Sequence, residues 1–371
     1  MLHDRFFRGS SNAPQVEQVS SRAGHGAREQ PDSCFARPHP VSPPTMPLPR
    51  IPVAEHDLPR DPSLDRRPRR SLKGAGIAVC ALLVTAGIAF ADRIPSWDGA
   101  GAAWTSFLPW TAVLLAVLGV FALVRRAWWG LSAVIVAAMV WSGVFVPQLM
   151  AAPVVSGPAD LLVATQNIGA GNADPTASAQ ALIATGAGLV AVQEIVGSTG
   201  GATALLDGTY GYHAAASTVG LWSLWQLGQP QPLELGLGWA RALRIVVHHP
   251  SGDVAVYAVH LPSVRPGDTA ARDQAVGELA AVIRSDTAPR VLVLGDLNTA
   301  TTDPALKALT DQMADSRETV KAGFGFTWPA QFPMTRPDHV LGRGVTAVSD
   351  QVLDAGGSDH RALVVGLRFA G

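Results

Sequence analysis

Three long apolar stretches dominate the first 150 positions of the chain. Each is free of charged residues over a length of about 18 to 22 positions. A helix of about 20 apolar residues crosses a bilayer. The pattern therefore predicts three transmembrane helices, at residues 74–91, 105–124 and 129–150. The first of them lies too far from the amino terminus for the apolar region of a signal peptide.

Basic residues flank these stretches unevenly and predict the orientation of the chain. Residues 66–73 hold five Lys or Arg, and Arg125 and Arg126 separate the second stretch from the third. Residues 92–102, between the first two stretches, have one Arg against two Asp. Because basic flanks stay in the cytoplasm, three spans place the chain after residue 153 outside. We therefore expect a multi-pass protein of the cell membrane whose carboxy-terminal domain is extracytoplasmic.

The first 72 residues are rich in Pro, Arg and Ser and show no sustained apolar period. This composition is typical of a disordered segment, which the orientation places in the cytoplasm. A basic arm that binds lipid or nucleic acid is the functional alternative.

After residue 158 the pattern changes to alternating short apolar runs and helical periods. Apolar runs at 161–167, 189–194, 254–259 and 291–294 are typical of buried strands, and residues 246–254 look like a hairpin. Helical periods follow, at residues 174–184, 268–284 and 303–310. Interleaved strands and helices indicate an α/β or α+β domain, and no internal repeat is visible.

Several of the buried runs end in polar side chains. Asp296 and Asn298, in Gly-Asp-Leu-Asn, follow one run, and their spacing would place both on one face if the strand continued. Polar groups at the end of a buried strand are costly unless something pairs with them, so the pattern predicts a functional site. The other polar ends are Asn167, Gln193-Glu194, His260 and Asp359-His360, and a further polar pair, Asp338-His339, opens the run Val340-Leu341.

Charge and cysteine content narrow the classes of function. Residues 151–371 contain 13 Lys or Arg against 19 Asp or Glu, a net charge of −6. Nucleic-acid binders usually present a basic face, so this balance weakens the case for a nuclease without excluding one. Cys34 and Cys80 both precede this domain, which excludes a disulfide framework or a thiolate metal site within it.

Taken in order, the polar motifs resemble those of the endonuclease/exonuclease/phosphatase superfamily. The resemblance covers roughly residues 159–369, and six motifs in the family's order are more specific than any one of them. It implies an α+β, deoxyribonuclease-like, four-layered α/β/β/α sandwich over residues 159–371. It also implies a Mg²⁺- or Mn²⁺-dependent hydrolase that acts on phosphoester bonds.

The resemblance assigns the metal and the phosphate to oxygen and amide groups. Glu194 and Asp359 are the expected metal ligands, which suits the preference of Mg²⁺ for carboxylates. Asn167 and Asn298 would bind phosphate oxygens through their amide groups, and Asp296 would position water or help to bind the metal. Taken alone, Glu194 is better explained as a surface acid at a strand end, but the series of motifs reverses that preference.

Two histidines supply the expected acid–base chemistry, since imidazole exists in both protonation states near neutrality. By resemblance, His360 contacts the scissile phosphate and polarises the attacking water, while Asp338 orients and charges it. His260 would stabilise the phosphate or donate a proton, although a lone histidine after an apolar run is more often a core residue. We expect the remaining histidines, His339, His248 and His249, to be structural or exposed.

One motif of the family is missing, because no Arg follows the Gln-Glu motif where many members have a Ser-Arg pair. Trp222 and Trp225 occupy this position instead. They are either exposed, where they could contact a membrane or an apolar substrate, or packed in the core.

The predicted function is a membrane-anchored phosphodiesterase with nuclease-type chemistry, its substrate a nucleic acid, a phospholipid or a small phosphodiester. The alternative is an inactive binding module at the bilayer. No protein partner is evident, and specificity is expected from loops such as residues 197–212 and 325–336.

Overall fold

The computed structural model describes residues 73–94, 97–150, 158–169, 171–265, 269–354 and 356–370. All of them belong to the unit that spans Arg69–Gly371. The predicted tail at residues 1–72 lies outside the described residues, so the expectation of disorder there stays a prediction.

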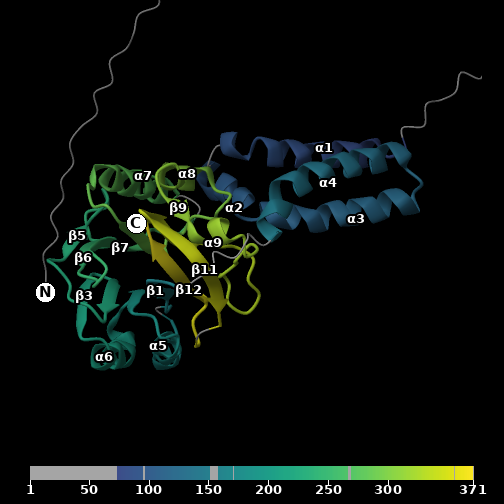
Figure 1. Cartoon of the computed structure of the whole chain (residues 1–371). Coiled ribbons are helices and arrows are strands. Elements are labelled where there is room, and N and C mark those ends of the chain that lie inside the picture. Colours follow the sequence, from purple (N-terminus) through teal and green to yellow (C-terminus); the bar gives the residue numbers. More distant parts are fainter. Residues whose placement is uncertain are drawn as a thin grey trace, which may run out of the picture. The chain divides into compact units, whose positions relative to one another are not determined.

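The amino-terminal part of the described chain is helical, and Figure 1 shows α1, α3 and α4 running alongside one another. Its elements are α1 (Ala75–Ala89), η1 (Ala91–Arg93), η2 (Trp97–Gly99), α2 (Ala100–Ser106), η3 (Leu108–Trp110), α3 (Thr111–Val124) and α4 (Trp128–Leu149).

The helix lengths match the three predicted spans only in part. Within the described residues, α4 alone is long and apolar enough to cross a membrane, and α1 has 15 residues. The span predicted at about 105–124 is α-helical from Thr111 to Val124, and near its start the chain bends by 58° between Ala100–Ser106 and Leu108–Val124. Pro109 stands at the start of η3, where its missing N–H interrupts the helical hydrogen bonds. The bent pair together passes the same test of length and apolar character.

The helices pack through small residues and remain apolar on the outside. Ala81 and Ala137 are fully buried, and a side chain at Gly130 would approach Cβ of Ile77 to 3.0 Å. More than half of each side chain is exposed at outward-facing positions such as Val79, Leu83, Val117, Val120 and Trp129. A helix that is apolar all round is typical of a buried or membrane environment.

The carboxy-terminal domain contains two six-stranded mixed sheets. The strand order is β11-β12-β1-β2-β4-β3 in one sheet and β5-β6-β7-β8-β10-β9 in the other. The strands are β1 (Leu161–Asn167), β2 (Leu189–Gln193), β3 (Tyr212–Ala216), β4 (Val219–Ser223), β5 (Gln231–Leu233), β6 (Ala242–Val247), β7 (Val254–His260), β8 (Val291–Asp296), β9 (Ala314–Asp315), β10 (Asp338–Arg343), β11 (Val345–Leu353) and β12 (Ala362–Phe369).

Alternation along the strands builds a core on each face of each sheet. In β8, Leu292 and Leu294 enter the core between the sheets, whereas Val291 and Val293 pack in the core that includes α7. The other sheet packs against α5 and α6 in the same way. The helices are α5 (Pro175–Ala184), α6 (Gly200–Thr209), α7 (Thr269–Ser285), α8 (Lys307–Thr310) and α9 (Ser316–Val320), with η4 (Gly197–Thr199) and η5 (Pro304–Leu306). The domain is therefore the expected α/β/β/α sandwich.

Two local expectations are settled by the packing. The predicted hairpin is present, since β6 and β7 pair antiparallel around residues 248–253. The hypothesis that Trp222 is exposed is wrong, because its side chain is 2% exposed and its indole N–H donates to Asp207 at 2.8 Å. Trp225 is partly buried, and its ring meets that of His249 edge-on at 4.5 Å.

Candidate active site

Three neighbouring strands of one sheet bring their polar residues to the same edge. Asp296 ends β8, and it pairs in register with His260 at the end of β7. On the other side it pairs with Asp338 at the start of antiparallel β10. Because paired residues point to the same face of a sheet, a histidine and two carboxylates stand in one row.

The Gly-Asp-Leu-Asn motif makes a tight turn rather than a longer strand. Gly295 has a φ of +140°, and a side chain there would lie 2.1 Å from the carbonyl oxygen of Val259, so only glycine fits. β8 ends at Asp296, and Asn298 adopts the left-handed φ of 47° that asparagine tolerates. Asp296 accepts from the backbone N–H of Asn298 at 2.9 Å and from its amide at 3.2 Å. The two side chains thus converge through a turn, and not through the continued strand that their spacing suggested.

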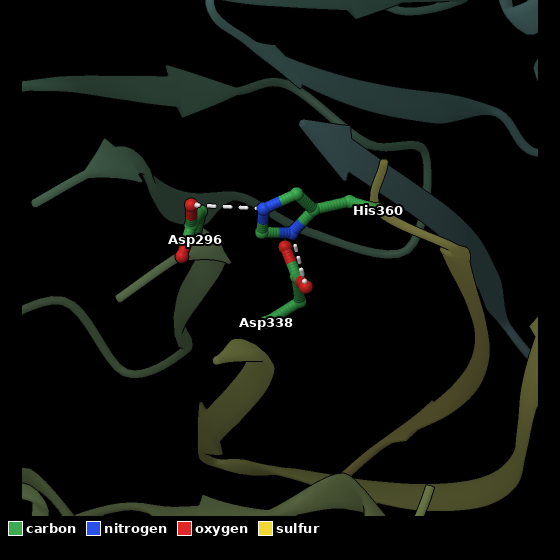
Figure 2. A group of neighbouring side chains, drawn as sticks. All are labelled: Asp296, Asp338 and His360. Atoms are coloured by element: carbon green, nitrogen blue, oxygen red, sulfur yellow. Dashed lines mark hydrogen bonds and ion pairs between the residues drawn. The ribbon is translucent and has the colours of Figure 1, made fainter. Parts of the chain in front are cut away.

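His360 directly contacts Asp338 (Figure 2). Its Nδ1 lies 2.9 Å from Oδ2 of Asp338, and its Nε2 lies 3.9 Å from Oδ2 of Asp296. The same oxygen of Asp338 accepts from the hydroxyl of Thr327 at 2.6 Å. Asp338 and His360 are both buried, so the contact is shielded from water.

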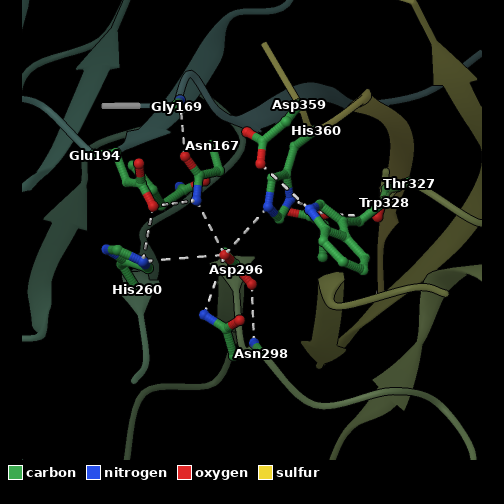
Figure 3. A network of polar contacts seen from close by, with 12 residues as sticks. Asn167, Gly169, Glu194, His260, Asp296, Asn298, Thr327, Trp328, Asp359 and His360 are labelled. Carbon is green, nitrogen blue, oxygen red and sulfur yellow. Dashed lines mark hydrogen bonds and ion pairs between the residues drawn. The ribbon is translucent and has the colours of Figure 1, made fainter. Parts of the chain in front are cut away.

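Asn167, at the end of β1 in the other sheet, joins the two halves of the site. Its amide nitrogen donates to Glu194 and to Asp296, each at 3.1 Å. Figure 3 shows this bridge above Asp296, with His260 and His360 to either side. Ser358 fixes the strand end, because its hydroxyl donates to the backbone carbonyl of Asn167 at 2.6 Å.

His260 faces the same carboxylates from the opposite side. Its Nε2 lies 3.7 Å from Glu194 and 4.0 Å from Asp296, and its Nδ1 lies 3.4 Å from the hydroxyl of Thr218. The side chain is 9% exposed. The histidine is therefore buried beside Glu194 and Asp296, two carboxylates that line the pocket, and not in purely apolar surroundings.

The two histidines have opposite charge states at neutral pH. Burial lowers the pKa of His260 to about 4, and the positive charge of Arg241 acts in the same direction. Burial also opposes a charge on His360, but the carboxylates of Asp338 and Asp296 outweigh it and raise its pKa to about 10. Burial raises the pKa of Asp296 to about 7, against the attraction of His360. Groups with pKa values driven apart in one cleft are typical of acid–base sites.

Metal-ligating atoms gather at this row of residues. Among the residues that the structure describes, one group of three acids or histidines has ligand atoms within 4.8 Å of one another: Asp296, Asp338 and His360. The predicted ligands Glu194 and Asp359 lie outside that group but line the same pocket as Asp296. Carboxylate oxygens are the hard donors that Mg²⁺ or Mn²⁺ prefers, so the residue types fit such an ion, but Glu194, Asp296 and Asp359 do not form a group whose ligand atoms all lie within 4.8 Å of one another.

These residues line a pocket of about 420 Å³. All of the predicted site residues except His260 and Asp338 contribute to its lining, and those two contact residues that do. Thr327 and Trp328 also contact residues of the site, although no local sequence pattern predicts them. Thr327 holds Asp338, and the indole N–H of Trp328 donates to Asp359 at 3.3 Å. Their sole signal in the sequence is that they fall within residues 325–336, one of the loops expected to set specificity.

The remaining histidines do not belong to the pocket. His339 is fully buried between Asp315 and the backbone carbonyl of Thr299, each at 2.8 Å. His248 pairs with Asp253 at 3.0 Å on the surface. They are structural or exposed, in line with the sequence.

The fold and this row of acids and histidines define a phosphoester hydrolase of the deoxyribonuclease-like class. The chain belongs to the endonuclease/exonuclease/phosphatase family, whose model matches residues 164–360. Members of that family act on phosphoester substrates and generally use divalent metals. A comparison with curated proteins found no match.

Solved structures of low sequence identity are similar to part of the chain. An endonuclease/exonuclease/phosphatase from Beutenbergia cavernae is 23% identical, with a TM-score of 0.48, over 57% of this chain and 72% of that one. TDP2 of D. rerio complexed with a single-strand DNA product is 15% identical, with a TM-score of 0.49, over 56% and 98%. Sphingomyelinase C from Streptomyces griseocarneus is 17% identical, with a TM-score of 0.42, over 57% and 99%.

Proposed function

We propose that the chain is a membrane-anchored, divalent-metal-dependent phosphodiesterase. The observation that supports this most strongly is the buried contact between His360 and Asp338 at 2.9 Å, with Asp296 on the other side of the imidazole. The row opens on a pocket that Glu194 and Asp359 also line. An inactive binding module is the weaker reading, because every predicted catalytic position holds a competent side chain.

The residues of the pocket divide the work of phosphodiester hydrolysis. His360, charged at neutral pH, donates a hydrogen bond to a phosphoryl oxygen and stabilises the charge that develops there. His260, neutral at the same pH, exchanges a proton with water or the leaving oxygen. Asn167 and Asn298 hold phosphate oxygens through their amides. A divalent cation held by Glu194 and Asp359, with Asp296 beside them, would neutralise the phosphate and bind water.

Two features of the helical part support the proposal that it anchors the chain in a membrane and the proposed orientation. Its outer surface is apolar on all sides, which water does not favour. Gly74, at the start of α1, lies against Ala127 in the turn between α3 and α4, so the basic residues Lys73, Arg125 and Arg126 gather at one end. The positive-inside rule assigns that end to the cytoplasm. We propose that the sandwich, at the other end of α4, is extracytoplasmic.

The pocket favours a phospholipid or small phosphodiester over a nucleic acid. Arg265 is the one Lys or Arg among the described lining residues, whereas Ala103, Phe107, Val264 and Trp328 add apolar surface. Nucleic-acid sites rely on several cations that neutralise successive phosphates. Nuclease-type cleavage, the default of the family, remains the second candidate.

The test uses the purified full-length chain in detergent. With Mg²⁺ or Mn²⁺ it should hydrolyse bis(p-nitrophenyl) phosphate, and a chelator should stop the reaction. Phospholipid vesicles and single-stranded DNA then compare the two natural classes of substrate, and we expect the vesicles to be cleaved faster. Failure to hydrolyse any phosphodiester with metal present would contradict the proposal.

A further inference from the structure

The pocket is not built by the sandwich alone. Ala103 and Ser106 of α2, and Phe107 directly after it, line the same cavity as Glu194 and His360. Phe107 is 37% exposed, so part of its ring is open to whatever enters. A segment of the helical part therefore forms one wall of the candidate active site.

The next turn of that segment, η3, holds a loop of the sandwich. The indole N–H of Trp110 donates to the backbone carbonyl of Met334 at 2.8 Å. The ring of Trp110 stacks on Phe326 at 6.0 Å and meets Phe332 at 5.8 Å. Trp110 thus contacts the loop through a directed hydrogen bond and through two aromatic neighbours.

This loop is the one that holds two acids of the site. Trp328 and Thr335 pair as an antiparallel bridge, which closes the loop into a tight hairpin. From this hairpin Thr327 bonds Asp338, and Trp328 bonds Asp359. The backbone N–H of Ala330 also donates to the carbonyl of Asp359 at 2.7 Å. A shift of the hairpin would move both carboxylates together.

Two further contacts tie the helices to the same side of the sandwich. Thr302, four residues after Asn298, donates its hydroxyl to the backbone carbonyl of Thr105 in α2. The backbone N–H of Gly323, just before the loop, donates to the carbonyl of Gln148 in α4 at 3.1 Å. The helices are therefore joined to the chain beside Asp296 and to the chain before Asp338.

We infer that the α2–η3 segment contributes to the active site by positioning its carboxylates and by contacting the substrate. Trp110 is a positioning residue that sets Asp338 and Asp359 through the hairpin at residues 327–335, and Phe107 is a specificity-determining residue in the pocket wall. The inference rests on the proposed phosphodiesterase function. It gives the helical part a second role beside anchorage, and it predicts that groups next to the reacting phosphate pack on Phe107.

The first experiment compares Trp110→Ala, Trp110→Phe and Trp129→Ala in the full-length chain in detergent, with bis(p-nitrophenyl) phosphate. Trp129 is 78% exposed on α4 and is the matched control. Because small displacements of catalytic groups cost up to about 100-fold in rate, Trp110→Ala should lower kcat by roughly tenfold or more and raise the Mg²⁺ concentration for half-maximal activity. Trp110→Phe keeps a ring but loses the N–H, and we expect an intermediate loss. Trp129→Ala should match the wild type.

The second experiment measures Phe107→Ala with two diesters. Its KM should rise more for bis(p-nitrophenyl) phosphate than for methyl p-nitrophenyl phosphate, because the second diester offers one aromatic group fewer. An inactive wild type would refute the proposed function itself. An active wild type with both Trp110 variants equal to Trp129→Ala in kcat and in Mg²⁺ requirement, or an unchanged KM ratio in Phe107→Ala, would refute the inference alone. If Trp110→Ala does not fold, the kcat and Mg²⁺ requirement of Trp110→Phe test whether Trp110 positions the carboxylates.

Discussion

Asp296 and Asp338 are directly paired across the β8–β10 ladder, and the imidazole of His360 contacts Asp338 and approaches Asp296. Two carboxylates side by side in a buried position repel each other. A protonated His360 reduces that repulsion, and this is why its pKa is raised to about 10 despite burial. The strand register thus creates a site that prefers positive charge, from an imidazolium or from a metal ion.

Loss of one predicted ligand should weaken metal binding without removing the pocket. Glu194→Gln keeps the size of the side chain but removes a negative charge that Mg²⁺ favours. We expect the Mg²⁺ concentration for half-maximal activity to rise by roughly tenfold or more. This is the lower end of the loss in metal affinity seen when residues that support a metal site are mutated. Activity titrations with Mg²⁺ measure this.

Glu278→Gln is the matched control, because Glu278 is exposed on α7. It should titrate like the wild type. Equal Mg²⁺ requirements for the two variants, or activity that resists a chelator, would exclude Glu194 as a ligand.

Acid should destabilise the sandwich through Asp286. Burial alone would raise the pKa of Asp286, but hydrogen bonds from Arg244, Ala288 and Tyr257 outweigh it and lower the pKa to about 2. A depressed pKa contributes stability that is present above the unfolded value, near 4, and is lost as pH falls toward 2. The contribution is on the order of 2 kcal/mol. In Arg244→Gln, the melting temperature at pH 7 should be lower, and it should fall less between pH 5 and pH 3.

Parallel melting curves of the wild type and Arg244→Gln, in detergent and followed by tryptophan fluorescence, provide the comparison. The two curves of melting temperature against pH should approach each other toward pH 2. Curves that stay parallel down to that pH would show that the pair between Arg244 and Asp286 does not account for acid sensitivity.

Reporter fusions should reveal the side of the membrane on which the sandwich lies. The basic residues before residue 74 and at 125–126 predict that a reporter fused after residue 157 is extracytoplasmic. Alkaline phosphatase fused there should be active, and a reporter that matures only in the cytoplasm should not. The reverse result would overturn the proposed localisation.

The residues of the site, but not their support, could be predicted from the sequence. Apolar runs such as Val291–Leu294 end in polar groups, and this marked Asp296 and His260 as candidates, but the strand register that pairs Asp296 with both Asp338 and His260 was not predicted. Thr327 and Trp328 reach the site from a hairpin with no periodic pattern. The contact of Trp110 with Met334 joins positions 224 residues apart, which local patterns do not encode.

The apolar stretches correctly predicted that these residues are helical, but they did not predict where every helix begins, ends or bends. Hydropathy marks residues 105–124 as continuous, yet the chain bends by 58° between Ser106 and Leu108, and Trp110 of the turn that follows contacts the sandwich. The length of α4 (Trp128–Leu149) agrees closely with the predicted 129–150. Average hydropathy does not register this break, because it takes no account of the missing backbone N–H of Pro109.

The central claim is that Asp338 and His360 act as one unit in phosphodiester hydrolysis. His360→Ala should lower kcat by a factor on the order of a thousand, because the charged hydrogen bond that stabilises the phosphoryl oxygen is lost. Asp338→Asn should cost somewhat less. As a control, His248 and Asp253 form a similar pair at 3.0 Å on the surface, and His248→Ala and Asp253→Asn should leave kcat unchanged.

The most direct measurement is therefore the kcat of the double variant Asp338→Asn/His360→Ala, in the full-length chain whose folding is checked by circular dichroism. Residues that act as a unit give strongly non-additive losses. The account predicts that the double variant is scarcely slower than His360→Ala alone. Losses that multiply, so that the double variant is slower by the product of the two single effects, would show that Asp338 acts independently of His360 and would contradict the proposed site.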